Sequence, residues 1–173
     1  MKQTILKYGL LAGTIIVLIP SISGLIIGYG EETFATGEII GYSTMIFSLM
    51  MIFVAVNKFQ KQFPNEHTGF KQIFLIGAGI SFIAGIMFGI YNVVHVLYID
   101  PEFMNNYYEY SINNIKNSGL SVKAVEQQIA EMESQKEMFM KPSVNFLLMF
   151  VTVFAIGLIV SIISGLFQKE KTT

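Results

Sequence analysis

The chain has 173 residues, of which 53% are hydrophobic and 13% are charged, and its formal net charge is −1. A composition this apolar lies outside the range of ordinary soluble domains, and a small net charge without arginine offers no electrostatic footprint for nucleic acid. The chain contains no cysteine, which excludes disulfides, thiolate catalysis and cysteine-ligated zinc.

Four long apolar runs without Lys, Arg, Asp or Glu account for most of this hydrophobicity. They cover residues 8–29, 39–56, 73–99 and 144–167. As helices rising ~1.5 Å per residue they reach roughly 27 to 40 Å, so each can span a hydrocarbon core about 30 Å thick. The sequence therefore predicts an all-α integral membrane protein, a four-helix bundle forming one membrane domain over residues 1–173 in a lipid bilayer.

The charged segments between these runs differ in sign. The two tails and the second connection hold seven Lys against two acidic residues, whereas the first and third connections hold four Lys against ten acidic residues. Because Lys is retained on the cytoplasmic side during insertion, we expect both termini and the second connection inside the cell. The third connection should then lie outside.

The first run contains Pro20, which removes a backbone donor and predicts a kink. The run also has two glycine pairs, which could pack against a neighbouring helix or make a contact between protomers. These pairs are Gly9 with Gly13 and Gly24 with Gly28.

The same segment also fits a signal peptide, with Lys2 and Lys7 before an apolar stretch and a small-residue cleavage site at residues 20–23. Against this, the apolar run continues past that site. A first transmembrane helix gives the same topology for everything downstream.

The third connection, residues 100–142, is the only part outside the runs that is long enough for structure of its own. Its helix start and stop signals are, in chain order, Asp100, Pro101, Gly119, Ser121 and Pro142. They predict an extracytoplasmic helical hairpin between the third and fourth spans, with helices over about 101–118 and 122–140.

Each predicted hairpin helix carries one apolar stripe with spacings of three and four. The first stripe is Met104, Tyr107, Tyr108, Ser111, Ile112 and Ile115, and the second is Val122, Val125, Ile129, Met132 and Phe139. The two stripes could pack against each other, or one could bind a partner protein or lie on the outer leaflet.

Small residues recur every four positions in the third and fourth runs. They are Gly77, Ser81, Gly85 and Gly89 in the third, and Gly157, Ser161 and Gly165 in the fourth. Such ridges allow two helix backbones to approach closely, so we expect the third and fourth spans to pack there. The alternative is that these small residues line a substrate path.

Asn92 and His95 stand out as strongly polar side chains within the third run. Counting residues across the hydrocarbon core places His95 at the outer interface, beside Asp100, where Glu38 could also lie. We expect a histidine satisfied there by water or a carboxylate, with a proton or ligand site as the alternative. No second His or Cys has the spacing of a metal site.

The sequence shows no phosphate-binding loop, dinucleotide fingerprint, zinc-protease motif or nucleophile elbow, and the runs lack the buried ionisable groups of ion-coupled transporters. We therefore expect no cofactor and a non-enzymatic role, in which residues 100–142 bind or stabilise a partner. A small transporter or channel, formed as an oligomer, is the alternative. A membrane enzyme would have to use Glu38, His95 and Asp100.

Several short segments together resemble a family of small four-span membrane proteins of Bacteroidota, the domain of unknown function 4199. They read KYGLLAG at 7–13, GYS at 41–43, FK at 70–71, MESQKEM at 132–138 and KP at 141–142. The resemblance covers essentially the whole chain and implies a bacterial inner membrane and a periplasmic hairpin. It carries no assigned active residues to transfer.

Overall fold

The computed structural model describes residues 1–28, 30–63 and 68–168, and within these ranges the regular structure is helical with no strand. The all-α prediction is thus confirmed. Four helical stretches are long and apolar enough to cross a membrane: Lys2–Ile27, Phe34–Gln62, Phe70–Ile99 and Pro142–Phe167. They contain the predicted runs except for the end of the first, where position 29 lies outside the described residues.

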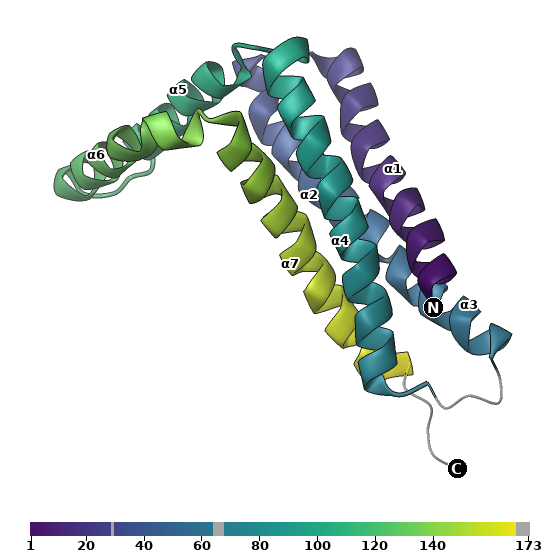
Figure 1. The fold of residues 1–173 in the computed structure, drawn as a ribbon. Helices are drawn as coiled ribbons and strands as arrows, with labels where there is room; N and C mark the ends of the chain where they lie inside the picture. Colours follow the sequence, from purple (N-terminus) through teal and green to yellow (C-terminus); the bar gives the residue numbers. More distant parts are fainter. Residues whose placement is uncertain (29, 64–67, 169–173) are drawn as a thin grey trace.

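The long helices stand side by side, and a pair of helices leaves one end of them (Figure 1). In chain order the elements are α1 (Lys2–Ile27), the 3₁₀ turn η1 (Glu31–Thr33), α2 (Phe34–Leu49), α3 (Met51–Gln62), α4 (Phe70–Val94), the π-helical turn η2 (His95–Ile99), α5 (Phe103–Lys116), α6 (Val122–Phe139) and α7 (Pro142–Gln168). The start of α1 and the ends of α3 and α7 lie at the end of the bundle away from α5 and α6 (Figure 1).

The second span consists of two helices rather than one. α2 ends at Leu49 and α3 begins at Met51, with Met50 between them at φ −61° and ψ −16°. The flattened ψ tightens the backbone locally toward 3₁₀ geometry. α3 then packs against α1, α4 and α7. No proline or glycine lies at this break, so it could not be predicted from local sequence signals.

α1 remains one helix across Pro20. The Ser21 hydroxyl donates to the Val17 carbonyl oxygen at 2.7 Å, one residue after the Ile16 carbonyl whose usual backbone donor Pro20 lacks. Gly9 and Gly13 face α4 within the same chain, where an added Cβ would lie 2.9 Å from Ile83 at Gly9 and would overlap Met87 at Gly13. These two glycines therefore serve close packing of α1 on α4.

α4 makes its most extensive contact with α7, along the two ridges of small residues. A Cβ at Gly77 would overlap the Ser161 hydroxyl, and a Cβ at Gly157 would overlap that of Ser81. The hydroxyls of Ser81 and Ser161 donate back to the carbonyl oxygens of Gly77 and Gly157, at 2.8 and 2.6 Å. Both serines are therefore satisfied within their own helices, and close contact rather than interhelical hydrogen bonding holds this crossing.

The partners of the ridge change along α4. Gly85 and Gly89 face the rings of Phe150 and Phe146 instead of small residues, and Gly165 faces the ring of Phe70. A Cβ at Gly85 or Gly89 would also lie 3.1 Å from the backbone oxygen of Phe150 or Phe146, so the backbones of α4 and α7 stay close at these positions too. Close contact between α4 and α7 therefore continues to Gly89, toward the end of the bundle that carries α5 and α6 (Figure 1).

The fully buried core lies toward the other end. Its largest side chains, none more than 2% exposed, are Ile16, Leu49, Ile52, Val56, Ile73, Ile76, Ile80 and Val153. The bundle is thus densely filled on the side of the termini.

α5 and α6 are two helices that contact each other and are joined by a short turn. Gly119 takes φ +72° in this turn, and the Ser121 hydroxyl accepts a hydrogen bond from the Ala124 amide at 3.4 Å as the N-cap of α6. The start of α5 differs from the prediction: the helix begins at Phe103 rather than 101. Asp100 instead ends the π-helical turn, where its amide donates to the His95 carbonyl oxygen at 2.8 Å.

Candidate functional site

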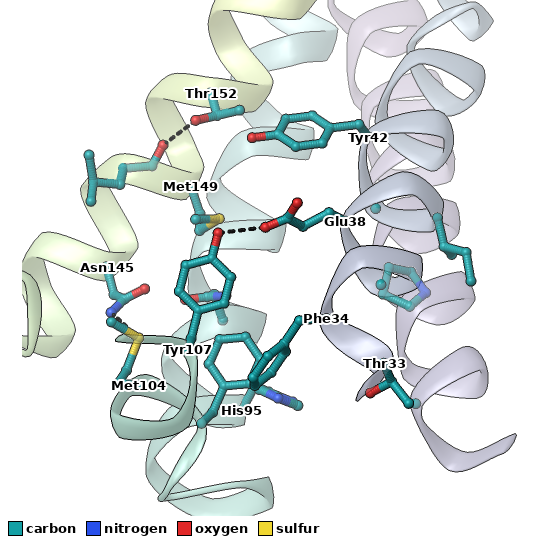
Figure 2. Close-up of a pocket in the computed structure, with 18 of the residues that line it drawn as sticks. Thr33, Phe34, Glu38, Tyr42, His95, Met104, Tyr107, Asn145, Met149 and Thr152 are labelled. Carbon is teal, nitrogen blue, oxygen red and sulfur yellow. Dashed lines mark hydrogen bonds between the residues drawn. The ribbon is translucent and has the colours of Figure 1, made fainter. Parts of the chain in front are cut away.

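A cavity of about 500 Å³ lies between α2 and α7, at the end of the bundle that carries α5 and α6. The ends of α1 and α2 form one wall, α4 and α7 form the opposite walls, and α5 and α6 cover it. Figure 2 shows Glu38 and Tyr42 on α2 facing Asn145, Met149 and Thr152 on α7 across this space. The lining is mainly apolar, with a few polar groups that converge, which is the usual composition of a small-molecule site.

A cluster of aromatic rings fixes α5 over the cavity. Phe34, at the first position of α2, is 6% exposed and lies edge-on to Phe103 and Tyr107, with ring centroids 5.6 and 5.5 Å away. The ring of Tyr110 lies 5.3 Å from it. Such ring pairs stabilise beyond their buried area, so Phe34 is the main anchor of α5 on α2.

Tyr107 also donates its hydroxyl to the Glu38 carboxylate at 2.7 Å (Figure 2). Burial, followed by this hydrogen bond, raises the pKa of Tyr107, so the residue stays a phenol at physiological pH. The charge-assisted bond joins residues 69 positions apart in the sequence and holds one carboxylate oxygen in the cavity wall.

His95 is buried at 5% exposure, which argues against water as its partner and leaves the carboxylate that was also expected. The ring of Phe103 lies edge-on to it at 5.1 Å and that of Tyr91 at 5.9 Å. α5 returns over the end of the third span and covers His95, an effect that counting residues through the bilayer cannot detect. His95 lines the cavity together with Asn92 and Glu38 (Figure 2).

Two asparagines add amide groups to the lining. The Oδ1 atom of Asn92 is buried and has no hydrogen-bond donor among the described residues. Asn145, only 4% exposed, donates from Nδ2 to the Met104 sulfur at 3.1 Å and to the Phe139 carbonyl oxygen at 3.3 Å. Sequence reasoning missed Asn145, although a polar amide at the start of an apolar run is itself a usable signal.

Of the three residues considered for a membrane enzyme, two lie in the cavity wall. Glu38 and His95 line the cavity, whereas Asp100 is not among its lining residues. In the parts of the chain that the structure describes, no group of three or more His, Asp or Glu is placed to hold a metal ion.

Comparison with known proteins supports the resemblance drawn from the sequence. A family model described as "Protein of unknown function (DUF4199)" matches residues 7–170, nearly the whole chain. The chain belongs to the DUF4199 family. No curated protein and no solved structure matches. The residues matched to DUF4199 include all of α2 to α7 and most of α1.

Tyr107→Phe tests how much the bond to Glu38 stabilises this end of the DUF4199 fold. The ring packing on Phe34 is retained, so we expect a loss of about 1 kcal/mol in the free energy of unfolding, the net value of one hydrogen bond. Unfolding of the detergent-solubilised protein, followed by far-UV circular dichroism, measures it. Tyr98→Phe is the matched control because Tyr98 is 78% exposed; equal effects of both substitutions would contradict the assigned role.

Proposed function

We propose that the protein is a non-enzymatic multi-pass protein of a bacterial inner membrane that binds a partner protein at the periplasmic face through the α5–α6 pair. The Lys-rich segments flank the end of the bundle that carries the start of α1 and the ends of α3 and α7. By the positive-inside rule that end faces the cytoplasm, with both termini there. The α5–α6 pair then projects into the periplasm as a helical hairpin.

The observation that carries the proposal is that this pair is anchored yet exposed. The cluster around Phe34 fixes its base, whereas no residue of α5 or α6 is fully buried. At the turn between the helices, Leu120 is 48% and Val122 is 75% exposed. Leu120 and Val122 are thus neighbouring apolar side chains that the α5–α6 turn exposes to the periplasm. We infer that they contact a partner protein.

A transporter or channel is the alternative, and the interior of the bundle disfavours a pore through one chain. Ser81, which would have to line a polar path below the cavity, is fully buried and packed against Gly157. Leu49, Ile80 and other fully buried side chains fill the described bundle on the cytoplasmic side of the cavity. A pore would therefore have to form between protomers.

In-cell photocrosslinking tests the proposed role of the pair. A benzophenone amino acid at Lys123, beside the tip, should form a discrete protein adduct in native membranes, and Leu120→Glu with Val122→Glu should abolish it. The same amino acid at Phe167, 81% exposed at the opposite end of the bundle, is the control and should not form that adduct. An adduct that survives the double substitution would refute the proposed surface.

A further inference from the structure

The cavity under α5 and α6 has the size of a ligand site. Its volume of about 500 Å³ corresponds to roughly 17 groups of the size of a water molecule at ~30 Å³ each. That is room for one alkyl chain with a small head group. Walls built from residues such as Phe88, Met45 and Met149 attract alkyl groups and do not hold water well.

Two groups in the wall can accept further hydrogen bonds. Glu38 uses one carboxylate oxygen for the Tyr107 hydroxyl, and an ionised carboxylate can accept several further hydrogen bonds. The buried Oδ1 atom of Asn92 lacks a donor among the described residues. Leaving a buried acceptor unsatisfied is costly, so a ligand that brings N–H or O–H groups would be favoured.

The charge in the wall also selects among amphiphiles. Glu38 lies on the α2 side of the cavity, where an anionic head group would be repelled. Lys136 is the cationic residue of the lining, but its Nζ lies 4.3 Å over the ring of Tyr108, and the residue is exposed to water. The Lys136 charge is therefore held against the Tyr108 ring, whereas the carboxylate of Glu38, a residue that is also exposed, faces the cavity.

We propose that this cavity binds a single-chain amphiphile, an alkyl chain with a neutral or cationic head group that carries hydroxyl or amine donors. The alkyl chain lies against the apolar walls of α4 and α7, and the head group donates to Glu38 and Asn92. This site is separate from the tip of the α5–α6 pair, so it stands whether or not the pair binds a protein.

The glycines of α2 offer a way to block the cavity without disturbing the fold. Gly37 and Gly41 both line it, and a Cβ added at either would meet no atom within 4 Å. Leucine at Gly41 therefore fills the cavity with an alkyl group. Ala35→Leu adds similar bulk to the same helix at an exposed position that does not line the cavity.

The test uses the full chain in phosphatidylcholine vesicles with monopalmitoylglycerol that carries a photoreactive diazirine in its chain. Labelling should map to the cavity walls of α2, α4 and α7. Unlabelled monopalmitoylglycerol and hexadecylamine should compete, and palmitic acid should compete roughly tenfold less well. Gly41→Leu should lower labelling roughly tenfold, with unchanged thermal stability, while Ala35→Leu should not.

Glu38→Gln removes the carboxylate charge while keeping a side chain of similar size, so it tests whether charge selects the ligand independently of cavity shape. Removing the carboxylate should bring palmitic acid close to equal competition, while Gly37→Leu should reproduce the block by Gly41→Leu. Labelling spread evenly over the outer surface of the bundle, or unaffected by either leucine, would overturn the site. Strongest competition by palmitic acid, or by dipalmitoyl phosphatidylethanolamine with its two chains, would overturn the ligand class.

Discussion

Gly157→Ala should destabilise the bundle by about 2 to 3 kcal/mol, the cost of overpacking a tight contact. The new Cβ would overlap both the hydroxyl and the Cβ of Ser81, so rotating the serine side chain cannot relieve the clash. α4 and α7 must move apart, which weakens contacts along their whole interface. Alanine is also a better helix former than glycine, so helix propensity works against the predicted loss. The free energy of unfolding in detergent micelles, measured by circular dichroism, gives the result.

A second substitution makes this prediction specific. Ser81→Gly removes the side chain that clashes, so Gly157→Ala combined with Ser81→Gly should recover most of the lost stability. The double-mutant cycle should then show strong coupling between the two positions. Gly41→Ala is the control, because a Cβ there meets open space and should leave stability unchanged or slightly raised. Additive losses at positions 81 and 157 would contradict the close crossing.

The spans and the local helix signals could be predicted because they depend on short-range chemistry. Apolar runs identify the spans, and Ser121 and Gly119 define the turn between α5 and α6 through capping and a positive φ. The break at Met50 could not be predicted, since it comes from packing of α3 against three helices rather than from a local breaker.

The cavity could not be predicted from the sequence either, because it also depends on packing between helices that are distant in the sequence. The spacing of four identified a ridge on α4 but not the residues opposite it, which change from Ser161 beside Gly77 to Phe146 beside Gly89. The spacing also does not show that α2 and α7 lie on opposite sides of a cavity under α5. The burial of His95 likewise depends on α5 returning over the span, with Phe103 against the imidazole.

Phe34→Ala should release the α5–α6 pair from the bundle. The ring contacts Phe103, Tyr107 and Tyr110 at once, and removing a buried phenylalanine typically costs about 3 to 5 kcal/mol. Because these contacts lie at one end of the molecule, the loss should be local. Hydrogen exchange should speed up across α5 and α6 while the amides near Ile76 and Ile80 keep their protection.

Phe47→Ala is the matched control, since Phe47 lies on the same helix and is 66% exposed. It should leave exchange in α5 and α6 unchanged. Tyr107→Phe should have only a small effect on the same amides, because the ring that packs on Phe34 remains. If Phe34→Ala also left the exchange of α5 and α6 unchanged, the pair would have to be held by its contacts with α7 instead of by the cluster on α2. The α5–α6 pair would then be held over the cavity by α7. The Glu38–Tyr107 hydrogen bond would be a single contact across the cavity and not an addition to close packing between α2 and α5.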